Sequence, residues 1–198
     1  MIDMTVSRKL ILASSSPYRQ ALLARLGVPF ICISPKVDES PEVGESPSSQ
    51  VLRLAQAKAE NVAVGYAGAL IIGSDQLAVL DGTVLGKPGA RAAARAQLLQ
   101  MRGRRVSFLT GVCVLDAATG KSTTDLVEYA VLFRDYSVEE IERYLRADAP
   151  YDCSGSFRSE KLGIALVDRM EGADPTALVG LPLIRLSQML REAGLAVP

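Results

Sequence analysis

The sequence predicts a single α/β domain over residues 1–198, with a mixed central sheet flanked by helices. The first half of the chain alternates short apolar runs with helical segments, which is typical of α/β proteins. Two long strand-like segments then follow each other across a short turn, and they indicate an antiparallel part of the sheet. The chain has 198 residues, of which 48% are apolar, and it shows no internal repeat, so one compact unit is expected.

Short apolar runs in the first half predict buried strands at 9–13 and 70–73, and a second strand at 30–34. A hairpin is expected at 77–85, because Asp81-Gly82 is a favoured turn dipeptide between two apolar segments.

Two helices are expected between these strands, from about Tyr18 to Leu26 and from Pro47 to about Val64. Ser16 and Ser46 each precede a proline, and serine is a favoured N-cap while proline is favoured at the first helical position. A polar, proline-bearing loop at 35–47 leads into the second helix.

The second half combines helices with long strands. Its expected elements are a helix from Ala90 to Met101, strands at 105–116 and 122–134, a helix from the capping box at Ser137 to about Arg146, an irregular loop at 151–160, a strand at 163–167 and a helix from Leu183 to Ala193 that Gly194 ends.

Composition excludes several classes of function. Lysine and arginine together number 22, as do aspartate and glutamate, so the formal charge is zero and bulk nucleic-acid binding is not expected. The sequence has no apolar run of about 20 residues and no apolar segment near its start long enough for a signal peptide, which predicts a cytoplasmic protein without membrane attachment. Cys32, Cys113 and Cys153 are far apart and are expected to be reduced, buried thiols with structural roles.

The absence of histidine is the most restrictive feature of the composition. It removes histidine-based catalytic triads, imidazole acid–base catalysis and most zinc or iron sites. Any metal ion is therefore expected to be bound by oxygen atoms, which favours Mg²⁺ or Mn²⁺.

The turn from Ser14 to Arg19 joins a strand to a helix, where free backbone N–H groups and the helix dipole favour a phosphate. An ordinary capped helix with a surface arginine would give the same pattern.

Asp75 is expected at the end of a buried strand, where open α/β sheets present ligand-binding residues, and a carboxylate there can be a metal ligand or a general base. It could equally be a turn aspartate bonded to its own backbone.

Lys58 lies on the apolar stripe of its helix, four residues after Leu54 and four before Val62. A cation at that position needs a partner, either in a structural ion pair or as a cleft-facing ammonium for phosphate.

Lys87 follows Gly86 in a segment that lacks the spacing of a P-loop, and it is either a phosphate ligand or a solvated turn lysine. The segment from Gly155 to Glu160 offers hydroxyl, guanidinium and carboxylate groups for binding, although a surface loop is the simpler interpretation.

Together, these segments resemble the Maf family of nucleotide pyrophosphatases over nearly the whole chain. The matching motifs are LILASSSPYR (10–19), VDE (37–39), LAQAKA (54–59), IGSDQ (72–76) with LGKP (85–88), and GSF (155–157) with SE (159–160). The Ser74-Asp75-Gln76 triplet and the VGLPL run (179–183) are similar to the YceF-type branch, whose implied substrate is 7-methyl-GTP. The resemblance implies a Maf/ITPase-like α/β fold with two lobes around a cleft.

The resemblance also implies roles for individual residues. Asp75 matches the proton acceptor and, with Glu39, a ligand of Mg²⁺ or Mn²⁺, and the phosphate-binding positions are Ser14, Arg19, Lys58 and Lys87. Tyr18, Gln76 and Glu160 match the positions that select the base. Gln20 departs from the family, which often has a second arginine there, and this substitution is expected to weaken phosphate affinity.

The expected activity is hydrolysis of a nucleoside triphosphate, 7-methyl-GTP, to the monophosphate and pyrophosphate, as a house-cleaning step in nucleotide metabolism. Alternatives are the same reaction on dTTP, UTP or CTP, a nucleotidyltransferase, or a non-catalytic nucleotide-binding regulator of cell division. A homodimer is an expectation from the resemblance alone.

Overall fold

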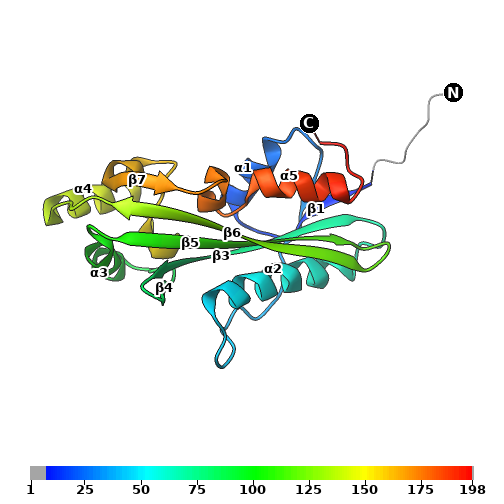
Figure 1. Ribbon diagram of the computed structural model, residues 1–198, viewed down its shortest axis with the longest axis horizontal. Coiled ribbons are helices and arrows are strands. Elements are labelled where there is room, and N and C mark those ends of the chain that lie inside the picture. The colour runs from blue at the N-terminus through cyan, green and yellow to red at the C-terminus, as the bar shows by residue number, and fades with distance from the viewer. Residues whose placement is uncertain (1–7, 198) are drawn as a thin grey trace.

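The computed structural model of the chain describes residues 8–197, and these contain one seven-stranded mixed sheet (Figure 1). The strand order is β2-β1-β3-β5-β6-β7, and β4 also pairs with β3. The strands are β1 (Leu10–Leu12), β2 (Ile31–Cys32), β3 (Leu70–Leu80), β4 (Thr83–Leu85), β5 (Arg105–Asp116), β6 (Lys121–Phe133) and β7 (Val167–Glu171). β1 is parallel to β2 and β3 and the other pairs are antiparallel, which confirms the predicted mixed α/β fold.

Helices cover both faces of the sheet. None of the helices within residues 8–197 is long and apolar enough to cross a bilayer. The α-helices are α1 (Pro17–Ala24), α2 (Pro47–Ala63), α3 (Arg91–Met101), α4 (Val138–Asp148) and α5 (Leu183–Glu192). Figure 1 shows α1 and α5 on one face of the long strands and α2 on the opposite face, while α3 and α4 lie toward the far end. Three clusters of buried apolar side chains fill the corresponding layers.

The predicted caps are confirmed. The hydroxyl of Ser16 accepts the N–H of Arg19, that of Ser46 accepts the N–H of Ser49, and Ser137 forms a full capping box with Glu140. These caps set where α1, α2 and α4 begin, and two of them precede residues of the predicted site.

The predicted strand at 163–167 is wrong. Residues Leu162–Leu166 form a 3₁₀ helix, η2, and β7 begins only at Val167. Gly163 and Leu166 are buried whereas Ile164 is exposed, so the buried positions are three residues apart, as in a 3₁₀ turn, and do not alternate as in a strand. Sequence analysis also missed a second 3₁₀ helix, η3 (Pro175–Val179), which precedes α5.

β3 is longer than predicted, and one of its edges is covered in two separate pieces. β1 pairs with its beginning, up to Ile72, and β4 pairs with its end, from Ala78. On the other edge β5 pairs without interruption from Leu70 to Val79. Residues 73–77 therefore have a strand partner on one edge only, and we call this uncovered edge the β3 gap.

Two glycines bring α2 unusually close to the sheet. A Cβ atom at Gly73 would lie 2.0 Å from the carbonyl oxygen of Ala55, and one at Gly111 would lie 2.2 Å from that of Val51. No larger residue fits beneath the helix at these positions, since both neighbours are backbone atoms. The close packing places α2 directly over the part of β3 that borders the gap.

Candidate active site

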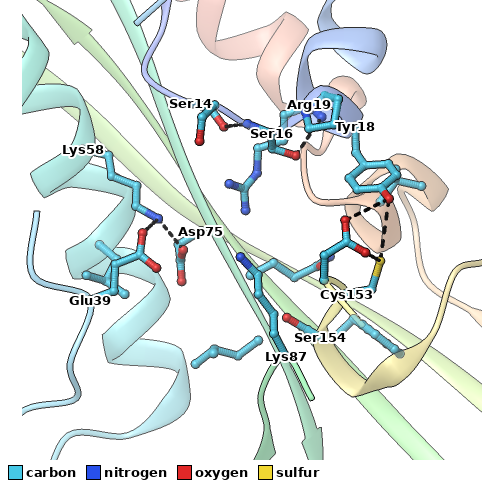
Figure 2. A pocket seen from close by; sticks show the side chains of 18 of the residues that line it. Ser14, Ser16, Tyr18, Arg19, Glu39, Lys58, Asp75, Lys87, Cys153 and Ser154 are labelled. Atoms are coloured by element: carbon cyan, nitrogen blue, oxygen red, sulfur yellow. Dashed lines mark hydrogen bonds and ion pairs between the residues drawn. The ribbon is translucent and has the colours of Figure 1, made fainter. Parts of the chain in front are cut away.

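A cleft of about 500 Å³ opens at the β3 gap. Every residue that the sequence singled out for the site contributes to its lining, namely Ser14, Tyr18, Arg19, Glu39, Lys58, Asp75, Gln76, Lys87 and Glu160. Figure 2 shows Lys58, Glu39 and Asp75 on one side of the cleft, facing the turn that carries Ser14, Ser16 and Arg19. Residues from six separate segments of the chain thus line one cleft.

Lys58 connects two carboxylates across the cleft wall. Its Nζ atom lies 2.7 Å from an oxygen of Asp75 and 2.7 Å from an oxygen of Glu39. The lysine is 5% exposed and Asp75 is 7% exposed, so both charges are largely removed from water, whereas Glu39 is exposed. Buried charges require such pairing, which accounts for the lysine on the apolar face of α2.

Asp75 does not end a strand, and that prediction is wrong. β3 continues to Leu80, and Asp75 pairs with Gly111 of β5 in its middle. The residue still borders the cleft because β1 ends at Leu12, which leaves the β3 gap beside it. The missing neighbour strand thus gives a mid-strand carboxylate the access that was expected from a strand end.

The Ser14 turn is arranged as an ordinary helix start that also directs an arginine into the cleft. The hydroxyl of Ser14 accepts the N–H of Ser16 at 3.1 Å. Arg19 Nε donates to the carbonyl of Gly180 at 2.8 Å, and Figure 2 shows its guanidinium directed toward the cleft. Burial lowers the pKa of Arg19, and the carboxylates of Asp75 and Glu39 oppose this shift. Sequence analysis gave no sign of Gly180 as the partner.

Lys87 is exposed at the cleft margin, and hydrogen bonds to the preceding residue, Gly86, hold the loop that carries it. The side chain of Gln97 donates to the carbonyl of Gly86 at 3.0 Å, and the N–H of Gly155 donates to the same oxygen at 3.3 Å. The Lys87 ammonium contributes to lowering the pKa of Glu39. This lysine is therefore not an isolated turn residue, because it belongs to the charge cluster of the cleft.

The segment before Glu160 is not a surface loop, contrary to the simpler interpretation. Gly155, Ser156, Phe157 and Arg158 are buried, and only Glu160 at its end is exposed. Phe157 and Glu160 both line the cleft, so this buried segment forms part of the cleft wall and places Glu160 at its margin.

Sequence analysis missed a polar cluster around Tyr18. The Tyr18 hydroxyl donates to Asp152 at 3.3 Å, and the guanidinium carbon of Arg158 lies 5.6 Å from the ring centre. Burial, followed by the nearby Cys153, raises the pKa of Tyr18 to about 12, so the phenol keeps its proton. Asp152 and Cys153 both line the cleft, and their position just before the Gly155 motif was the available signal.

The thiols differ from the prediction that all three are buried. Cys113 is buried, whereas Cys32 and Cys153 are partly exposed, and all three are free.

Gln76 lines the cleft, but its side-chain amide is occupied. The amide nitrogen donates to the carbonyls of Ala177 and Leu178 at 2.5 and 3.1 Å. Any contact of this side chain with a ligand would therefore involve its oxygen atom.

The donor set of the cleft is compatible with a hard divalent cation that arrives with a substrate. No group of three or more histidine, cysteine, aspartate or glutamate side chains within residues 8–197 is arranged to hold a metal ion. Asp75 and Glu39 nevertheless lie close together around Lys58. Mg²⁺ sites often consist of one or two carboxylates completed by substrate phosphates and water, and this pair fits that pattern.

The pKa of Glu39 gives a testable pH dependence. Burial alone would raise it, but Lys58, with Lys87 and Arg19, outweighs this and lowers the pKa below its ordinary value of 4.5. The stabilisation from this charge is therefore fully present above pH 4.5 and lost as the pH falls through the lowered pKa.

We expect the melting temperature of Glu39→Gln to differ from that of the parent by a constant amount between pH 8 and pH 5, and by less at lower pH. The effect is small, at most about 1 kcal/mol, since water screens this exposed side chain. Melting curves from pH 8 down to about pH 3, below the ordinary pKa of a glutamate, test this. A difference that grows on acidification would show that burial controls the pKa.

Comparisons with known proteins agree with this geometry. The family model described as "Maf-like protein" matches residues 9–193. A protein of Pseudomonas syringae pv. tomato named 7-methyl-GTP pyrophosphatase is 54% identical over 189 residues, covering 96% of this chain and 98% of its own. A protein of Ralstonia nicotianae with the same name is 56% identical over 183 residues, covering 92% and 94%.

Among solved structures, a Vibrio cholerae protein aligns over 72% of each chain with 11% identity and a TM-score of 0.37, a similarity too low to support a conclusion. The match of the family model over almost the whole chain and the closeness of its full-length relatives agree with each other, and this chain belongs to the Maf family.

Proposed function

We propose that this chain is a nucleoside triphosphate pyrophosphatase that hydrolyses 7-methyl-GTP to 7-methyl-GMP and pyrophosphate. The observation that carries the proposal is Lys58 paired with Asp75 and Glu39 in a cleft that Arg19 and Lys87 also line. Such a cluster combines a carboxylate that can take a proton from water with cations that can bind a polyphosphate. The names of the Pseudomonas and Ralstonia relatives support the choice of substrate.

The triphosphate is proposed to bind between the Ser14 turn and Lys58. The turn offers the N-terminal end of α1, where backbone N–H groups and the helix dipole favour an anion. Arg19 and Lys87 lie on the same cleft and add positive charge for the β- and γ-phosphates. The start of α1 is held by its Ser16 cap and Arg19 by Gly180, so these two groups can stabilise charge in the transition state without a large rearrangement.

Asp75 is the proposed general base. It accepts a proton from a water molecule whose oxygen attacks the α-phosphorus, the bond between that phosphorus and the α,β-bridging oxygen breaks, and pyrophosphate leaves with the bonding electrons. Lys58 holds Asp75 in place through their ion pair. Mg²⁺ or Mn²⁺ held by Asp75, Glu39 and the phosphates would supply neutralisation of the phosphate charge.

Tyr18 and Glu160 are proposed to select the base. Methylation at N7 makes guanine cationic, and a cation over a desolvated aromatic face gains about 1–2 kcal/mol. Arg158 lies over one face of Tyr18, so the base would stack on the other. Glu160 at the cleft margin can accept N–H groups from the Watson–Crick edge.

A substrate panel tests this function. We expect pyrophosphate release from 7-methyl-GTP with a kcat/KM at least tenfold above that for GTP, dTTP, UTP and CTP, because only the methylated base carries the charge that Tyr18 recognises. The measurement is pyrophosphate release with Mg²⁺ or Mn²⁺. Faster cleavage of a pyrimidine nucleotide would overturn the substrate assignment, and absence of any turnover would favour a regulatory binding protein.

Two tyrosine variants test whether Tyr18 is responsible for the preference for the methylated base. Tyr18→Leu should reduce the preference for 7-methyl-GTP over GTP by roughly tenfold, which corresponds to the cation–π energy. Tyr66→Leu is the matched control, because Lys9 lies over that ring at 5.2 Å in a region outside the cleft. The control should leave the preference unchanged.

A cytoplasmic location and a homodimer also remain proposals. Each can be measured directly, by cell fractionation and by sedimentation of the purified chain.

A further inference from the structure

The main-chain N–H and C=O groups of Gln76 point into the β3 gap. Alternation along β3 establishes this. The N–H of Leu70 donates to Lys9 at 2.9 Å and the carbonyl of Ile72 accepts from Ala13 at 2.8 Å, so the even-numbered residues direct their main-chain groups toward β1. The carbonyl of Ala69 accepts from Ala117 at 2.9 Å, so the odd-numbered residues face β5.

The alternation continues to Gln76, because β3 and β5 pair in an unbroken register from Leu70 to Val79. β1 no longer pairs at this position and β4 does not begin to pair until Ala78. Among residues 8–197, no partner is present for either main-chain group of Gln76. Main-chain groups at a strand edge normally bond to another strand, to water or to a ligand.

The surroundings of Gln76 hold this edge in place for a ligand. The residue is partly exposed and lines the cleft. Its side chain is anchored on η3 through the carbonyls of Ala177 and Leu178, which holds residue 76 in place beside the cleft. Asp75 precedes it, and Tyr18 and Glu160 line the same cleft.

We propose that the main-chain N–H of Gln76 donates a hydrogen bond to the oxygen at position 6 of the guanine base. This inference rests on the proposed function, and it assigns base recognition to the backbone in addition to side chains. A backbone N–H can donate to a keto oxygen at position 6, but it cannot donate to the amino group that adenine carries there, because that group is itself a donor. The contact therefore distinguishes keto from amino bases whatever side chain residue 76 carries.

Amide hydrogen exchange measured by NMR tests the contact. In the free protein, the amide of Gln76 should exchange much faster than those of Asp75 and Leu77, which donate toward β5 and serve as internal controls. Addition of 7-methyl-GTP with a methylene group in place of the α,β-bridging oxygen should slow exchange at Gln76 by at least tenfold and leave both controls unchanged.

A second ligand identifies the atom. The corresponding triphosphate of 2-aminopurine lacks the oxygen at position 6, so it should bind the cleft without slowing exchange at Gln76. Binding is reported independently by amide shifts in the Ser14–Arg19 turn. If the 7-methyl-GTP analogue shifted the amides of that turn but left exchange at Gln76 unchanged, this inference alone would be overturned, as it would by equal protection from both ligands. No shift anywhere in the cleft would contradict the proposed function as well.

Discussion

Replacing Asp75 by asparagine is expected to lower kcat by about a hundredfold to ten-thousandfold while leaving the protein folded, the range that removal of a general base produces. Asparagine has nearly the same shape and can still accept a hydrogen bond from Lys58, which also keeps Glu39 as a partner. It cannot take a proton from water. The measurement is the rate of pyrophosphate release at saturating nucleotide, with the melting temperature recorded in parallel.

The matched control for this variant is Asp116→Asn. Asp116 forms an ion pair with Arg8 outside the cleft. The substitution therefore removes the carboxylate partner of a cation, as Asp75→Asn does, but at a position away from the site. It should leave kcat within about twofold of the parent. If Asp75→Asn retained near-normal turnover, another group would have to activate the water, and the proposed role of Asp75 would be wrong.

Gly73→Ala is expected to destabilise the protein by about 3 kcal/mol or more, at or above the upper end of the usual range for overpacked cores. The new Cβ would lie 2.0 Å from the carbonyl oxygen of Ala55, and a helix backbone cannot move aside as a side chain can. α2 would have to lift from the sheet and take Lys58 with it. Because shifts of about 1 Å can cost a hundredfold in rate, activity should fall well below what unfolding alone explains.

Urea denaturation and kcat measured on the folded fraction check both parts of this prediction. Gly111→Ala should behave similarly, since its Cβ would lie 2.2 Å from the carbonyl oxygen of Val51. Gly65→Ala is the control, because no atom lies within 4 Å of the added carbon. A stable, active Gly73→Ala protein would show that the distance between α2 and the sheet does not control the site.

Local sequence signals predicted the parts of the fold that depend on local chemistry. Ser16-Pro17 and Ser46-Pro47 specified two helix starts, because capping acts within one turn. The apolar stripe of α2 indicated that Lys58 faces inward, and its need for a partner follows from the cost of burying a charge. The resemblance to the Maf family then named residues that all line one cleft.

Features that depend on contacts between distant segments were not predictable in this way. The position of Asp75 relative to the end of its strand depends on where β1 stops pairing, some sixty residues earlier in the chain. Arg19 is held by Gly180, and Tyr18 by Asp152, over still greater separations. The 3₁₀ helix at Leu162–Leu166 was mistaken for a strand because a short apolar run carries too little periodicity to tell the two apart.

The β3 gap also bears on how the protein avoids aggregation. Unpaired strand edges attract strands from other molecules, and proteins usually protect them with charges, prolines or bulges. Here β1 and β4 occupy the edge on either side of residues 73–77, which leaves a length too short for an invading strand to pair stably. A base or another small planar molecule still fits. The sheet can therefore keep main-chain hydrogen-bonding groups available inside its cleft without the self-association that a longer open edge would promote.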